Sequence, residues 1–68
     1  MKAKIVALGK IKREFPPRGQ LQLFQLEKPA TFTCSLRKTE VTSARVAINL
    51  TTGELLSNGA YGQLLAGK

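Results

Sequence analysis

Residues 30–36 read Ala-Thr-Phe-Thr-Cys-Ser-Leu, with apolar side chains at the even positions and hydroxyl side chains at the odd ones. Successive side chains of a β-strand point to opposite faces, so this alternation predicts a strand with one face in a core and the other in solvent. Threonine also favours strands. We therefore expect this segment to be the centre of an all-β domain, with Cys34 as a small core residue.

Further apolar runs flank this segment on both sides. Residues 20–27 alternate but change parity in mid-run, which can indicate a β-bulge or a sharp twist, and the Lys-Pro pair at 28–29 ends the run. Residues 44–50 again alternate, and the Gly-containing segment 51–54 before a second apolar run predicts a hairpin. Residues 57–62 predict a loop because they contain two glycines and an asparagine.

The last residues, 63–68, fit either a turn of helix or a short final strand. With the N-terminal segment, about five short strands and no long amphipathic helix are expected. This pattern favours a single domain over residues 1–68, a small antiparallel sheet curled into a partly open five-stranded barrel.

The N-terminal segment carries lysine at even positions and small or apolar residues at most odd positions. We predict a strand over residues 2–13 whose lysines form one outward row: Lys2, Lys4, Lys10 and Lys12. A helix is the competing interpretation and would align Ile5, Leu8 and Lys12 in a weak apolar stripe. The lysines could also serve only to keep an edge strand from pairing with other sheets.

Composition points to a polyanionic partner. The 68 residues carry 11 Lys and Arg against four acidic side chains, for a net charge of +7. Such an excess raises encounter rates with nucleic acid, an acidic protein or an anionic membrane, although a basic surface can also serve solubility alone. No apolar run is long enough for a transmembrane helix or a signal peptide, so a cytoplasmic protein is expected.

The sequence offers little for catalysis or metal binding. It has no histidine, one cysteine and four glutamates that are scattered along the chain. No internal disulfide can form, and neither a structural zinc site nor a cofactor is indicated. A general acid–base pair finds no suitable spacing either, so we expect a binding protein and not an enzyme.

Nucleic-acid binding is the leading hypothesis, with single-stranded DNA or RNA favoured because no recognition helix is evident. Arg13 and Arg18 flank a Phe-Pro-Pro loop, and further basic residues surround the third and fourth predicted strands. Phe15 and Tyr61 are the candidate rings for base stacking. The full set of candidate contacts is Lys2, Lys4, Lys10, Lys12, Arg13, Phe15, Arg18, Arg37, Lys38, Arg45 and Tyr61.

Three alternatives remain open at this point. The same basic face could dock an acidic protein partner, as in a small accessory subunit. Open strand edges could support assembly into a homo-oligomer, since a core of this size supplies only about 3–5 kcal/mol. A dimeric β-ribbon that reads duplex DNA is also compatible with the strand pattern.

Overall fold

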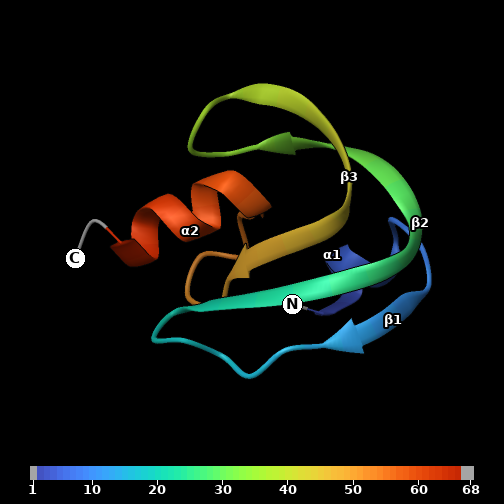
Figure 1. Ribbon diagram of the computed structural model, residues 1–68, viewed down its shortest axis with the longest axis horizontal. Helices are drawn as coiled ribbons and strands as arrows, with labels where there is room; N and C mark the ends of the chain where they lie inside the picture. The colour runs from blue at the N-terminus through green and yellow to red at the C-terminus, as the bar shows by residue number, and fades with distance from the viewer. Residues whose placement is uncertain (1, 67–68) are drawn as a thin grey trace.

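The computed structural model describes the backbone of residues 2–66 and the side chains of residues 3–66. Four antiparallel strands pair in chain order, and two helices pack against them (Figure 1). The elements are α1 (Lys2–Val6), β1 (Ile11–Glu14), β2 (Leu21–Cys34), β3 (Thr39–Asn49), β4 (Leu55–Ser57) and α2 (Asn58–Ala66). The mostly β character is confirmed. Over residues 2–66 the sheet has four strands and is not closed, so the predicted five-stranded barrel is not confirmed.

β2 and β3 form a long hairpin that bends sharply (Figure 1). Gln25 lies opposite Arg45, but the next pair is Ala30 with Ser43, so four residues of β2 face one residue of β3. Within this bulge the backbone N–H of Glu27 donates instead to the carbonyl of Lys10, at 2.9 Å. The predicted strand end at residues 28–29 is therefore wrong. Proline is tolerated there because the bulge demands no ladder hydrogen bond from it.

The first half of β2 buries side chains on both of its faces, which explains the parity change in the sequence. The α2-side cluster contains Leu21, Leu23, Cys34, Ala47, Leu56, Ala60 and Tyr61. The α1-side cluster contains Ile5, Phe24, Leu26, Phe32, Val46 and Ile48. Because one helix contributes to each cluster, both sheet faces are covered where the first half of β2 pairs with β3. The bulge lies further along the strand than the parity change suggested.

The predicted strand over residues 2–13 is wrong in its first half, where α1 forms. Ile5 is 0% exposed and docks into the α1-side cluster, and Leu8 is partly buried against the same cluster. Ile5 lies in α1 and Leu8 lies in the turn that follows it, where the N–H of Leu8 donates to the carbonyl of Ile5 at 3.0 Å. The Nζ of Lys4 donates to the carbonyl of Gly53 at 2.8 Å, which ties α1 to the β3–β4 turn. The predicted lysine row therefore does not form, and the side chain of Lys2 lies outside the described residues.

The predicted loop at residues 57–62 is also wrong, because α2 begins at Asn58. The Oγ of Ser57 accepts a hydrogen bond from the N–H of Ala60 at 3.1 Å, the usual arrangement of a helix N-cap. Two glycines lower the helix propensity of this segment, but burial of Ala60 and Tyr61 offsets that cost.

Two hydrogen bonds donated by backbone N–H groups join the C-terminal end of β2 to β4. The N–H of Ser35 donates to the carbonyl of Leu55 at 2.9 Å, and the N–H of Ser57 lies 3.4 Å from the sulfur of Cys34. Cys34 is fully buried, as predicted, whereas Leu36, predicted to face inward, is exposed in the β2–β3 turn. Burial raises the pKa of the Cys34 thiol, but hydrogen bonds, the largest from the Ser57 backbone, bring the net pKa below its ordinary value.

The hairpin predicted at residues 51–54 is confirmed. β3 and β4 pair antiparallel, with Ala47 opposite Leu56. The side-chain oxygen of Asn49 accepts hydrogen bonds from the N–H groups of Thr51 and Thr52, at 2.8 and 3.1 Å. Gly53 has a φ of +79°, a conformation that other residues rarely adopt. These local interactions fix the turn against which α1 packs.

Candidate functional site

The register of the sheet places two of the predicted arginines in one row. Arg13 of β1 lies opposite Gln25 of β2, and Gln25 lies opposite Arg45 of β3. Residues directly opposite one another share a sheet face, and neighbouring strands lie about 4.8 Å apart. The two arginine backbones are therefore about 10 Å apart, with a glutamine between them. We call these three residues the Arg–Gln–Arg row.

The row lies on the same side of the sheet as α2. Gln25 is two residues beyond Leu23, and Arg45 is two residues before Ala47. Leu23 and Ala47 both belong to the α2-side cluster, and alternate residues of a strand share a face. The row is consequently the first exposed part of this face beyond the region that α2 covers.

Phe15 adjoins the row. The N–H of Phe15 donates to the carbonyl of Leu23 at 3.1 Å, and the side-chain amide of Gln22 donates to the carbonyl of Phe15 at 2.8 Å. The ring is half-buried against the α2-side cluster. The guanidinium carbon of Arg13 lies 5.9 Å from the ring centroid, within the range of a cation–π interaction. A partly accessible ring and a cation therefore lie side by side.

A tight turn positions Arg18, which lines the same hollow as Phe15. Arg18 and Leu21 exchange two backbone hydrogen bonds, at 2.7 and 3.0 Å. Gly19 within this turn has a φ of +60°, where a side chain would be strained. The side chain of Arg18 is exposed. The Phe-Pro-Pro loop is thus bracketed by Arg13 and Arg18, as the sequence suggested.

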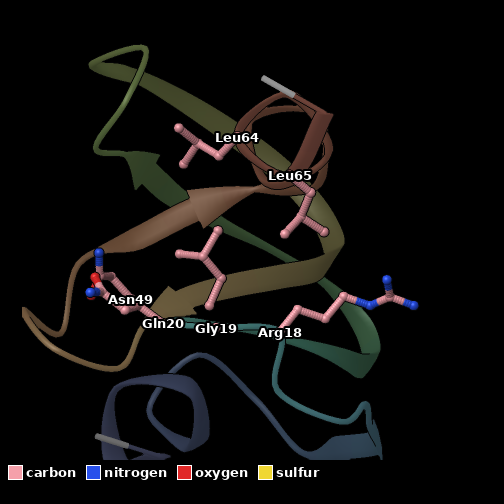
Figure 2. Close-up of a pocket in the computed structure, with 7 residues that line it drawn as sticks. Arg18, Gly19, Gln20, Asn49, Leu64 and Leu65 are labelled. Atoms are coloured by element: carbon pink, nitrogen blue, oxygen red, sulfur yellow. The ribbon is translucent and has the colours of Figure 1, made fainter. Parts of the chain in front are cut away.

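Two adjoining hollows open beside this loop and α2. The first, of about 320 Å³, is lined by Phe15, Pro16, Pro17, Arg18, Leu23, Tyr61 and Leu65. The second, of about 400 Å³, is lined by Arg18, Gly19, Gln20, Leu21, Asn49, Leu64 and Leu65. Figure 2 shows Leu64 and Leu65 of α2 above the start of β2, with Arg18 at one end of the hollow and Asn49 at the other. Because the hollows share Arg18 and Leu65, we treat them as one α2 groove.

Tyr61 is not the exposed loop residue that the sequence predicted. It was predicted to lie in a loop, but it lies in α2 and its side chain is only 9% exposed. The ring therefore belongs mainly to the core and supplies a wall of the α2 groove. Phe15 is the more accessible of the two nominated rings.

The other predicted basic residues lie elsewhere. Arg37 extends across α2, where its Nη2 is 3.3 Å from the side-chain oxygen of Gln63, and Lys38 follows it in the β2–β3 turn. Lys10 lines a separate hollow at the β2 bulge, together with Glu27 and Lys28. Lys12 lies at the register shift of β1, at the sheet edge, a position where charge discourages edge pairing. The structure therefore places Arg13 and Arg45 in one row and Arg18 at the hollow that Phe15 lines, whereas Lys4, Lys10 and Lys12 lie elsewhere.

Gln25 and Leu65 line the candidate site but were not among the predicted contacts. Gln25 has the same parity as Leu21 and Leu23, which places it on the face of the α2-side cluster. That signal was present in the sequence, but its meaning depends on which face carries arginines from the neighbouring strands. Leu65 was not nominated, because residues 57–62 were predicted as a loop and residues 63–68 were left open between a turn of helix and a strand.

Comparisons with known proteins add no family. Scans of protein-family models, curated proteins and solved structures find no match to this chain. Over the described residues, no helix is long and apolar enough to cross a membrane. Residues 2–66 also contain no group of three or more acidic or cysteine side chains that could hold a metal ion.

Proposed function

We propose that this protein binds single-stranded nucleic acid, DNA or RNA, without catalysing a reaction. The observation that carries the proposal is that Arg13 belongs both to the Arg–Gln–Arg row, with Arg45, and to the surroundings of the half-buried Phe15 ring, where Arg18 lines the same hollow. Proteins that bind single-stranded nucleic acid usually combine basic side chains with an accessible aromatic ring. The net charge of +7 strengthens attraction to any polyanion.

The arginines and Phe15 have different roles in the proposed binding, which follow from the chemistry of their side chains. An arginine guanidinium can grip a phosphate with two parallel hydrogen bonds, so Arg13, Arg18 and Arg45 are the phosphate contacts. Phe15 provides a face on which a base can stack. The lysines that lie outside this group, together with Arg37 and Lys38, contribute to the general positive field and not to specific contacts.

Duplex DNA is the less suitable ligand. Reading a duplex usually requires a helix or a two-stranded ribbon that enters the major groove. α1 has five residues and α2 has nine, and each packs its buried side chains onto the sheet. Neither helix is therefore free to insert into a groove.

The α2 groove also supports a second candidate, an acidic protein segment. Its lining includes Pro16, Pro17, Leu64 and Leu65 beside Arg18. Such a surface suits a peptide that presents an apolar side chain next to a carboxylate. In this case the protein would be an accessory subunit of a larger assembly.

A salt-dependent titration tests the proposal. Fluorescence anisotropy of labelled 12-nucleotide single strands and of a matched duplex is measured at several salt concentrations. We expect the single strand to bind more tightly, with log affinity falling against log salt by about 0.7 for each phosphate contacted. Three arginine contacts therefore predict a slope of about −2. Absence of binding at low salt, or tighter binding of the duplex, would overturn the proposal.

A further inference from the structure

Gln25 is the member of the Arg–Gln–Arg row whose role is not explained by charge. It is half-buried, and within the described residues its carboxamide forms no hydrogen bond, unlike the carboxamides of Gln22 and Gln63. No side-chain nitrogen or oxygen of the described residues is both buried and unpartnered, so the amide atoms of Gln25 reach solvent. A polar group held between two cations and left free is available to a ligand.

The chemistry of this amide differs from that of its neighbours. The two guanidiniums offer hydrogen-bond donors only, whereas a glutamine offers a donor nitrogen and an acceptor oxygen on the same planar group. A phosphate needs donors and is best served by the arginines. A base edge that carries a donor next to an acceptor is best served by the glutamine.

We propose that Gln25 reads the Hoogsteen edge of the base at one position of the bound strand and therefore favours adenine. This inference rests on the proposed function, since it requires a single strand to lie across the row. On its Hoogsteen edge adenine presents the N6 amino donor beside the N7 acceptor, the pair that a glutamine amide matches with two hydrogen bonds. On the same edge cytosine has no ring-nitrogen acceptor, thymine has no donor and guanine has two acceptors. Arg13 and Arg45 hold the phosphates on either side, which brings an unpaired base over Gln25.

Phe15 completes the arrangement. Arg13 lies 5.9 Å from its ring, so the strand that contacts Arg13 passes next to the aromatic face. Stacking tolerates every base because each has a π-face. The ring therefore contributes affinity without sequence preference, and Gln25 contributes preference with little share of the electrostatic affinity.

The test compares labelled 12-mers of deoxyadenosine, deoxycytidine and thymidine by anisotropy at one salt concentration. The native protein is expected to bind the adenine 12-mer about fivefold or more tightly than the others. Gln25→Ala is expected to remove this preference and to leave the salt slope unchanged. Gln25→Glu is expected to weaken all binding and to shift the preference toward cytosine, whose N4 amino group donates to a carboxylate.

Gln63→Ala is the matched control, because Gln63 is an exposed glutamine whose amide lies against Arg37 and outside the row. It is expected to retain the adenine preference. Equal affinities for the three 12-mers, or a preference that survives Gln25→Ala, would overturn the role of Gln25 while leaving the proposed function standing. Absence of binding to every 12-mer would overturn both.

Discussion

The fold brings two arginines of this chain onto one surface but separates the lysines near its N-terminus. Arg13 and Arg45 come from different strands and end two strand spacings apart on one face. The lysines of the first twelve residues look periodic in the sequence but are separated between α1, the start of β1 and a bulge at the sheet edge. Charge spacing along a chain therefore predicts a surface only where the backbone conformation is already known.

Lys4 has a structural role and not a place in a basic surface. Its ammonium group is fixed on the carbonyl of Gly53, 49 residues away, and so joins α1 to the β3–β4 turn. No comparable protein contact fixes Arg18 or Arg45 among the described residues, and both side chains are exposed. We infer that the lysine is committed to the fold and that the arginines are available to a ligand.

The largest effect should come from a charge-matched comparison. Arg13→Ala with Arg45→Ala and Lys10→Ala with Lys12→Ala each remove two positive charges. We expect the arginine pair to lower affinity for a single strand at least about tenfold and to reduce the salt slope by about 1.4. The lysine pair should lower affinity less than about threefold, because it weakens only the general field. Equal losses in anisotropy titrations would show that no specific arginine site exists.

An intermediate effect is expected at Phe15. Phe15→Leu keeps an apolar side chain against the α2-side cluster but removes the aromatic face. Affinity should fall about fivefold, the lower end of the stacking contribution, while the salt slope stays the same. Phe15→Tyr should bind like the native protein. If Phe15→Leu binds normally and is folded by circular dichroism, base stacking on this ring is excluded.

The smallest effect concerns Lys4. Lys4→Met removes the hydrogen bond to Gly53 and keeps most of the apolar stem, so the free energy of unfolding should fall by about 1 kcal/mol. Affinity for nucleic acid should change little. Urea denaturation measures the first quantity, with Lys12→Met as the control that should not alter stability. A loss of affinity that exceeds that of Lys12→Met would place Lys4 in the binding surface.

The elements that depend on interactions between neighbouring residues could be predicted from the sequence. The alternation of residues 30–36 predicted a strand, which the structure forms as far as Cys34. The core position of Cys34 and the hairpin before Leu55 were also predicted correctly. The N-cap at Ser57 was also a local signal, but the two glycines of the first helical turns obscured it. These elements require no knowledge of distant parts of the chain.

The position of α1 and the grouping of the arginines depend on contacts between residues far apart in the sequence. α1 forms because Ile5 docks into a cluster contributed by β2 and β3, which the first ten residues do not reveal. The neighbourhood of Arg13 and Arg45 depends on two strand registers that meet at Gln25, just before the bulge. The sequence analysis therefore named all three arginines of the candidate site but could not show which charged residues lie together.

Mapping the contact surface by NMR tests the central claim most directly, since a chain of 68 residues is well suited to amide chemical-shift measurements. A single-stranded 12-mer is titrated into the isotopically labelled protein. We predict that the largest amide shifts cluster at residues 13–15, at Arg18, Gln25 and Arg45, and along the α2 groove. Shifts centred on α1 and the lysines at positions 10 and 12, with Gln25 and Arg45 unaffected, would contradict the account.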